Sequence, residues 1–65
     1  MIVLAIKDDK GLYYCGFNTW NKEIRKAKFY VSNYYAEDVV RINKYRNPTI
    51  VKVDIKELKK KKEDK

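Results

Sequence analysis

The 65-residue chain contains no histidine and a single cysteine, and these two scarcities exclude much catalytic and metal chemistry. Without histidine the commonest general base is missing, so most nucleophile–base pairs cannot be built. One cysteine cannot form an internal disulfide, and a zinc site would have to rest on Cys15 and carboxylates alone. We therefore expect a protein that is not an enzyme and that has no metal site and no cofactor.

Glycine, proline and long apolar runs are also scarce. With two glycines and one proline, the chain has no glycine-rich phosphate loop. The apolar run over residues 2–6 is too short for a signal peptide, and a membrane span needs about 20 apolar residues. These absences predict a cytoplasmic protein that has no membrane partner.

Positive charge is what the chain has in excess. Its 16 Lys and Arg residues against 9 Asp and Glu residues give a net charge of +7, which favours acidic or phosphate-bearing partners. A hydrophobic content of 45% argues against disorder of the whole chain. So short a chain buries only about 60% of the surface that its unfolded form exposes, so its core is small. Binding to a partner would therefore stabilise it by burying more surface.

The first third of the sequence predicts a β-hairpin followed by a loop. Residues 2–6 and 12–17 are β-type runs, and Gly11 stands where a hairpin turn needs a positive φ. Gly16, inside the second run, predicts a bulge or a strand end. Residues 18–23 are polar around one tryptophan and predict a loop.

The rest predicts a strand, a helix and a last strand. Apolar and polar residues alternate over 26–31 and 49–55, which is typical of half-buried strands. Between them, Ser32 or Asn33 can cap a helix of about three turns that ends before Pro48. The order ββ-loop-β-α-β predicts an α+β fold, a small sheet of three to four mostly antiparallel strands with one helix on one face.

The composition also predicts where this domain ends. Residues 1–58 are expected to form a single α+β domain. Residues 59–65 are lysine-rich and have no apolar anchor, so they predict a disordered tail.

The alternation further predicts an uncovered face of the sheet. If the apolar positions of 26–31 and 49–55 face the helix, the residues between them lie on the other side, together with Val3 and Ala5. With one helix nothing covers that side, so it is either an interaction surface or a roof of lysine stems and tyrosine rings. A tryptophan in the predicted loop either closes the core or is an exposed anchor. The predicted partner-binding residues are Trp20, Lys26, Lys28, Tyr30, Ile50 and Lys52.

Two other chemistry-bearing features have plainer interpretations. Cys15 lies in a predicted strand and is more typical of a small buried residue than of a nucleophile. Asp8 and Asp9 lie in the predicted hairpin loop, where turn chemistry explains them better than an acid pair or a magnesium site.

Three segments together carry a resemblance: YYCGFNTW at 13–20, RKAKFYVS at 25–32 and YAEDV at 35–39. With them, over most of residues 10–55, the chain resembles short phage and prophage proteins of Gram-positive bacteria. The resemblance implies action in the cytoplasm of an infected or lysogenic host. Because short phage proteins are often inhibitors or adaptors, it also implies a host protein as target, antiviral defence included.

Two functions follow from these patterns. The first is a small binding protein that modulates or inhibits a host protein through the uncovered face and the tryptophan loop, with a homodimer compatible with this role. The alternative is a nucleic-acid-binding protein that stacks bases on tyrosine and contacts phosphates with lysine and arginine. The residues of this alternative are Arg25, Lys26, Lys28, Tyr30, Lys52, Lys59, Lys60, Lys61 and Lys62.

Overall fold

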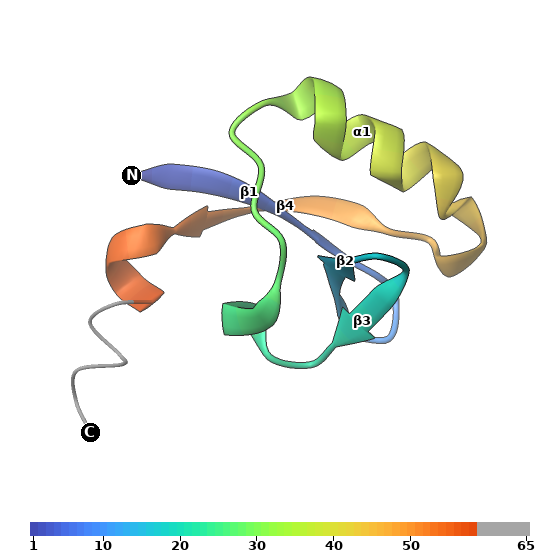
Figure 1. The fold of residues 1–65 in the computed structure, drawn as a ribbon, viewed down its shortest axis with the longest axis horizontal. Coiled ribbons are helices and arrows are strands. Elements are labelled where there is room, and N and C mark those ends of the chain that lie inside the picture. The colour runs from blue at the N-terminus through green and yellow to red at the C-terminus, as the bar shows by residue number, and fades with distance from the viewer. Residues whose placement is uncertain (59–65) are drawn as a thin grey trace.

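The computed structural model describes residues 1–58 and has an α+β fold (Figure 1). Four antiparallel strands form one sheet in the order β3-β2-β1-β4, and one α-helix packs against it. No described helix is long and apolar enough to cross a bilayer. The predicted tail, 59–65, lies outside the described residues. The elements are β1 (Ile2–Lys7), β2 (Tyr13–Gly16), β3 (Thr19–Asn21), η1 (Ile24–Lys26), α1 (Asn33–Ile42), η2 (Lys44–Arg46) and β4 (Thr49–Asp54).

The first hairpin is confirmed. β1 and β2 pair antiparallel, and Gly11 has the positive φ, 84°, that this turn requires. Asp8 organises the turn, because its Oδ1 accepts hydrogen bonds from the N–H groups of Lys10 and Leu12, both at 2.9 Å. The turn interpretation of Asp8 is therefore correct.

The segment predicted as a loop, 18–23, contains the third strand of the sheet. β3 pairs with β2 through a tight turn in which Phe17 and Asn18 both have positive φ, 52° and 59°. The register shifts between Tyr14 and Gly16, which confirms the irregularity predicted at the glycine.

The strand predicted over 26–31 is wrong, because this segment forms only an isolated bridge. Gly16 ends β2 early, so β2 cannot pair along the whole of β1. Residues 26–31 cross this gap and pair with β1 instead. Leu4 N–H donates to the Tyr30 carbonyl at 2.7 Å, and Tyr30 N–H donates to the Leu4 carbonyl at 2.8 Å. On the other side, Lys28 N–H donates to the Tyr14 carbonyl at 2.8 Å.

The predicted uncovered face is also wrong. Val3 pairs with Val53 and Ala5 with Val51, so all four lie on the same side of the sheet, where they form a core with Ala27. The chain around η1 covers this side. The helix lies on the opposite side of β1 and β4 (Figure 1). Alternation separates two faces of a strand but does not say which face meets the helix.

The helix begins as predicted and ends earlier. Ser32 is its N-cap, with its Oγ accepting from Tyr34 N–H at 3.1 Å. The helix does not continue to Pro48, because Asn43 caps its end by donating Nδ2–H to the Val39 carbonyl at 2.9 Å. The 3₁₀ turn η2 then leads into β4.

Candidate functional site

The structure divides the predicted partner-binding residues among three places. Trp20, Lys28 and Tyr30 meet on the β2–β3 half of the sheet. Lys26 ends η1 and points away from the helix. Ile50 and Lys52 lie in β4 on the helix side, the former half-buried and the latter exposed. In the nucleic-acid alternative, Arg25 also lies in η1, and Lys59, Lys60, Lys61 and Lys62 lie outside the described residues.

Aromatic rings and cations form a continuous row on the β2–β3 half. Tyr14 and Trp20 face each other across the strands, with ring centroids 5.1 Å apart at 62°. The Arg46 guanidinium lies 4.3 Å from the Trp20 ring centroid, and Lys28 Nζ lies 5.8 Å from that of Tyr30. Burial, with Tyr14 nearby, raises the pKa of the Tyr30 hydroxyl. We call these five residues the aromatic–cation row.

The row explains Trp20 better than either predicted role. Its ring is half-buried between Tyr14 and Arg46, so it is neither a core plug nor an exposed anchor. Lys28 likewise lies over Tyr30. One face of the Trp20 ring and one face of the Tyr30 ring are therefore occupied by the chain's own cations.

Arg46 is held in the row by a buried carboxylate. The side chain of Asp8 is 1% exposed, and its Oδ2 accepts from Arg46 Nε at 3.1 Å and lies 3.0 Å from Nη2. Burial alone would raise the pKa of Asp8, but hydrogen bonds from Leu12, Lys10 and Arg46 outweigh it and hold that pKa below its usual value. The charged pair therefore stabilises the fold between the first turn and η2.

Two further features have structural explanations in the described part of the chain. Cys15 is half-buried, and its Sγ donates to the Tyr13 carbonyl at 3.4 Å. Among residues 1–58, no three or more His, Cys, Asp or Glu side chains gather as metal ligands would. Asp9 instead accepts a hydrogen bond from Asn47 Nδ2 at 3.1 Å.

The most exposed large apolar side chain of the described residues is Phe17, at the tip of the β2–β3 hairpin. It is 98% exposed and has a φ of 52°, the left-handed region that bulky residues rarely adopt. Gly16 and Asn18, on either side, also have positive φ. Thr19 Oγ1 donates to the Gly16 carbonyl at 2.6 Å and closes the turn. The tip thus holds a bare aromatic ring on a defined backbone.

A cationic side chain lies beside this tip. A Cβ on Gly16 would stand 3.5 Å from Lys28 Cδ, so the Lys28 stem packs on the bare glycine backbone. Sequence reasoning missed Phe17 because it counted the residue as part of a strand. The signal that was available is Asn18, which favours positive φ, directly after an aromatic residue and between two β-type runs.

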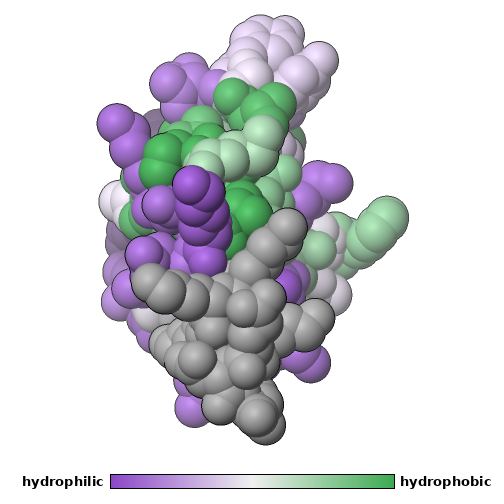
Figure 2. All heavy atoms as spheres, turned by 90° about the vertical axis from the view of Figure 1, so that its left-hand side faces the viewer, coloured by the Kyte–Doolittle hydropathy of each residue, from purple (hydrophilic) through white to green (hydrophobic). Residues whose placement is uncertain are grey.

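A second exposed apolar group lies at the end of the molecule that holds the N-terminus. Met1 and Ile2 are exposed at this end, as are Val31 and Tyr34, which follow the bridge between Tyr30 and Leu4 of β1, and Figure 2 shows hydrophobic side chains gathered on this side. Val31 was expected to face the helix, but it is 83% exposed because the segment before Ser32 is not part of the sheet. We call these four residues the apolar end.

Comparison with known proteins adds no relative: no family model matches the chain, and neither the curated proteins nor the solved structures contain a significant match. Fold and site therefore define this chain as a small α+β protein whose distinguishing surface feature is an exposed aromatic hairpin tip.

Proposed function

We propose that this chain is a small non-enzymatic binding protein that docks onto another protein through the β2–β3 hairpin, with Phe17 as its anchor. The observation that carries the proposal is a phenylalanine that combines a left-handed backbone with a 98% exposed ring. Backbone strain of this kind concentrates at functional sites.

Phe17 is an unfavourable residue for the stability of the isolated chain. A left-handed backbone costs a residue with a Cβ about 1–2 kcal/mol. Leaving the ring in water forgoes about 1.5–3 kcal/mol that burial of a phenylalanine contributes. Asparagine or glycine at Phe17 would reduce both costs, whereas a rigid aromatic side chain is well suited to fill a pocket on a partner.

The surroundings of the tip suggest the chemistry of the partner. An apolar pocket would accept the Phe17 ring, and Lys28, whose stem passes Gly16 and whose ammonium lies over Tyr30, favours an acidic surface near that pocket. The resemblance to short phage proteins makes a bacterial host protein, including one of antiviral defence, the proposed target.

The test compares Phe17→Asn with Phe17→Leu. Asparagine suits the turn and removes the anchor, so the melting temperature should rise while binding is lost; leucine keeps the apolar anchor and should keep most binding. The original chain and each variant are immobilised on beads and incubated with nuclease-treated lysate of a Gram-positive host. The captured proteins are then quantified by mass spectrometry.

The expected result is one host protein that the original chain and Phe17→Leu retain and that Phe17→Asn loses by at least about tenfold, roughly 1.4 kcal/mol. Equal capture by all three proteins would show that the hairpin tip is not the docking site. A lower melting temperature for Phe17→Asn would show that the phenylalanine stabilises the turn, and the strain argument would fail.

A further inference from the structure

We propose that the outer edge of β4 pairs with the same strand of a second copy, so that two chains form one continuous antiparallel sheet. β4 (Thr49–Asp54) is the last strand in the order β3-β2-β1-β4, so β1 lies on only one side of it. An edge strand presents backbone N–H and C=O groups with which another strand can pair. The contact is separate from the Phe17 tip, which lies on the β2–β3 half at the opposite edge of the sheet.

The hydrogen bonds of β1 show which backbone groups of β4 point outwards. Leu4 is the partner of Lys52 in the ladder, but its N–H and C=O bond to Tyr30 on the other side of β1. Because bonded and non-bonded pairs alternate along an antiparallel ladder, the N–H groups of Ile50, Lys52 and Asp54 all point away from β1. No other strand of residues 1–58 lies beyond them.

The charged side chains of β4 select one register for this pairing. A lysine on an edge strand usually prevents pairing with unrelated strands. With Val53 opposite Val53 of the second copy, however, Lys52 of each copy lies directly opposite Asp54 of the other. Opposite charges at such positions stabilise a ladder, and two-fold symmetry makes the contact twice. The Asp54 N–H of each copy then donates to the Lys52 carbonyl of the other.

The neighbouring registers lack this complementarity. Moving the two-fold axis to Lys52 would place two lysines directly opposite each other, and like charges there destabilise a ladder. Moving it to Val51 would place Lys52 opposite Ile50, which leaves the lysine without a counter-charge. The charges therefore favour the register at Val53, and they match β4 to a second copy of itself.

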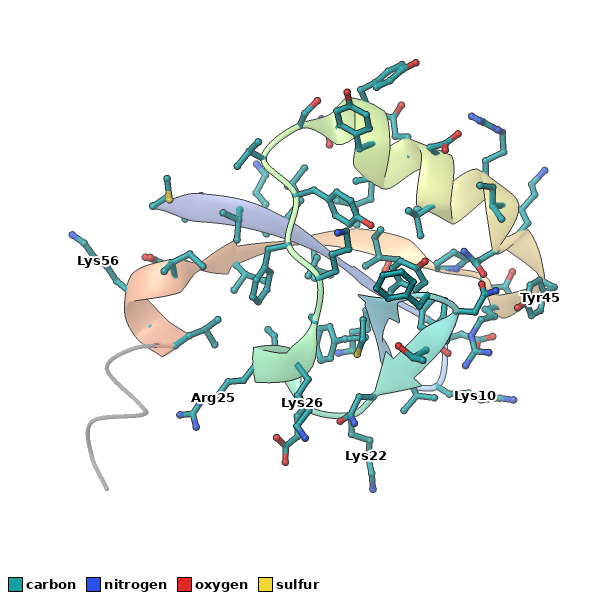
Figure 3. The ribbon with its side chains drawn as sticks, viewed as in Figure 1. Lys10, Lys22, Arg25, Lys26, Tyr45 and Lys56 are labelled. Atoms are coloured by element: carbon teal, nitrogen blue, oxygen red, sulfur yellow. The ribbon has the colours of Figure 1, made fainter. Side chains whose placement is uncertain are left out.

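Apolar side chains follow the same symmetry on the η1 side of the sheet. Val51 and Ile55 lie two positions before and after Val53, and both are half-buried against the core. In this register Val51 of one copy lies opposite Ile55 of the other, so pairing covers apolar surface that a single copy leaves partly exposed. The contact ends there, because the residues after Asp54 form a helical turn, from which Lys56 points away from the molecule (Figure 3).

The apolar end is not part of this contact. Val31 follows Tyr30, which bonds to Leu4 on the side of β1 that faces away from β4. Substitutions at one surface therefore distinguish it from the other.

The test reverses the two charges and measures dimer formation by sedimentation equilibrium and native mass spectrometry. Lys52→Asp places aspartates opposite each other, and Asp54→Lys places lysines opposite each other, so each variant alone should dimerise at least about tenfold more weakly than the original chain. An equimolar mixture of the two variants should form a heterodimer, because every lysine at the contact then lies opposite an aspartate.

Two exposed positions outside the strand supply matched controls for the change in charge. Lys44→Asp and Glu37→Lys change the net charge by the same amounts and should leave dimer formation nearly unchanged. A single chain with both Lys52→Asp and Asp54→Lys restores the opposite charges. That chain should dimerise again, which separates a lost contact from a loss of folding in either single variant.

Three results would overturn the proposal. The first is an original chain that stays monomeric at about 1 mM, where even weak pairs associate. The second is a mixture of Lys52→Asp and Asp54→Lys that forms no more dimer than the separate variants. The third concerns Val31→Lys, which should leave the heterodimer unchanged when both partners carry it; loss of the heterodimer would assign the contact to the apolar end instead.

Discussion

Asp8 is the residue at which a local turn and a long-range contact meet. Its carboxylate closes the β1–β2 turn through backbone N–H groups and also holds Arg46, 38 positions later in the chain. Arg46 in turn lies over Trp20, so one buried charge connects the first turn, η2 and the aromatic–cation row. Because the core is small, a carboxylate that connects three parts of the chain in this way contributes a large share of the contacts that hold the fold together.

We predict that Asp8→Asn destabilises the protein by about 1–3 kcal/mol at neutral pH, because the half-buried Arg46 guanidinium loses its charged hydrogen-bond partner. The pKa of Asp8 is lowered in the folded state, so its contribution is fully present above its unfolded pKa, about 4, and is lost as the pH falls through the folded pKa. Urea denaturation of the original chain and of Asp8→Asn, from pH 7 downwards, should therefore show that the difference in their free energies of unfolding becomes smaller under acidic conditions.

The matched control for this prediction is Asp9→Asn, which changes the exposed neighbour in the same turn. It should alter stability by less than about 1 kcal/mol and keep the acid dependence of the original protein. If the difference in free energy of unfolding between Asp8→Asn and the original chain is the same at all pH values, the charge of the Asp8 carboxylate does not stabilise the fold.

At the scale of elements, the helix depends on its packing against the sheet and on its caps. α1 has ten residues, a length that is marginal for an isolated helix in water. Its buried anchor is Ala36. Ser32 Oγ accepts a hydrogen bond at its start, and Asn43 Nδ2–H donates one at its end. The caps therefore set where the helix starts and stops on the sheet.

We predict that Ser32→Ala lowers the free energy of unfolding by about 1 kcal/mol, because Tyr34 N–H loses its acceptor. Ser32→Asp should restore that stability, since a carboxylate accepts the same hydrogen bond and also favours the positive end of the helix dipole. Thermal unfolding followed by circular dichroism measures the stability of both variants. Equal losses in the two variants would mean that the hydroxyl acts through packing instead of capping.

At the scale of the whole molecule, most of the buried hydrophobic side chains in residues 1–58 are small, whereas several large apolar ones are exposed. Four of the six buried hydrophobic residues in the described part of the chain are alanine or valine on the η1 side of the sheet: Val3, Ala5, Ala27 and Val53. The apolar end, by contrast, remains in contact with water. An exposed apolar group on so small a protein favours association with another surface.

We predict that the chain self-associates at its apolar end at high concentration, because a second copy would cover Val31 and its neighbours. Val31→Lys should shift the protein towards monomer in sedimentation equilibrium, since it places a charge within the contact. Ile42→Lys makes the same kind of change at an exposed position on the other end of the helix and should have little effect. If both variants and the original chain remain monomeric at millimolar concentration, the apolar end does not mediate self-association.

Local chemistry was sufficient to predict the features that depend on neighbouring residues. The first hairpin follows from Gly11, the helix start from Ser32, and β4 from the alternation before the tail, because each needs only contacts within a few residues. The α+β class follows from the order of these elements. Cationic charge at 25–28 was likewise visible in the sequence, although its distribution over two sides of the molecule was not.

Only the tertiary structure decided the third strand, the side covered by the helix and the exposure of Phe17. Residues 19–21 pair with the outer edge of β2, and because β2 ends early at Gly16, residues 26–31 cross the gap that it leaves beside β1. Alternation separates the two faces of a strand, but long-range packing selects which one meets the helix. Asn18 could indicate the turn at Phe17, but exposure depends on what the rest of the chain leaves uncovered, so no local pattern could show that the ring stays in water.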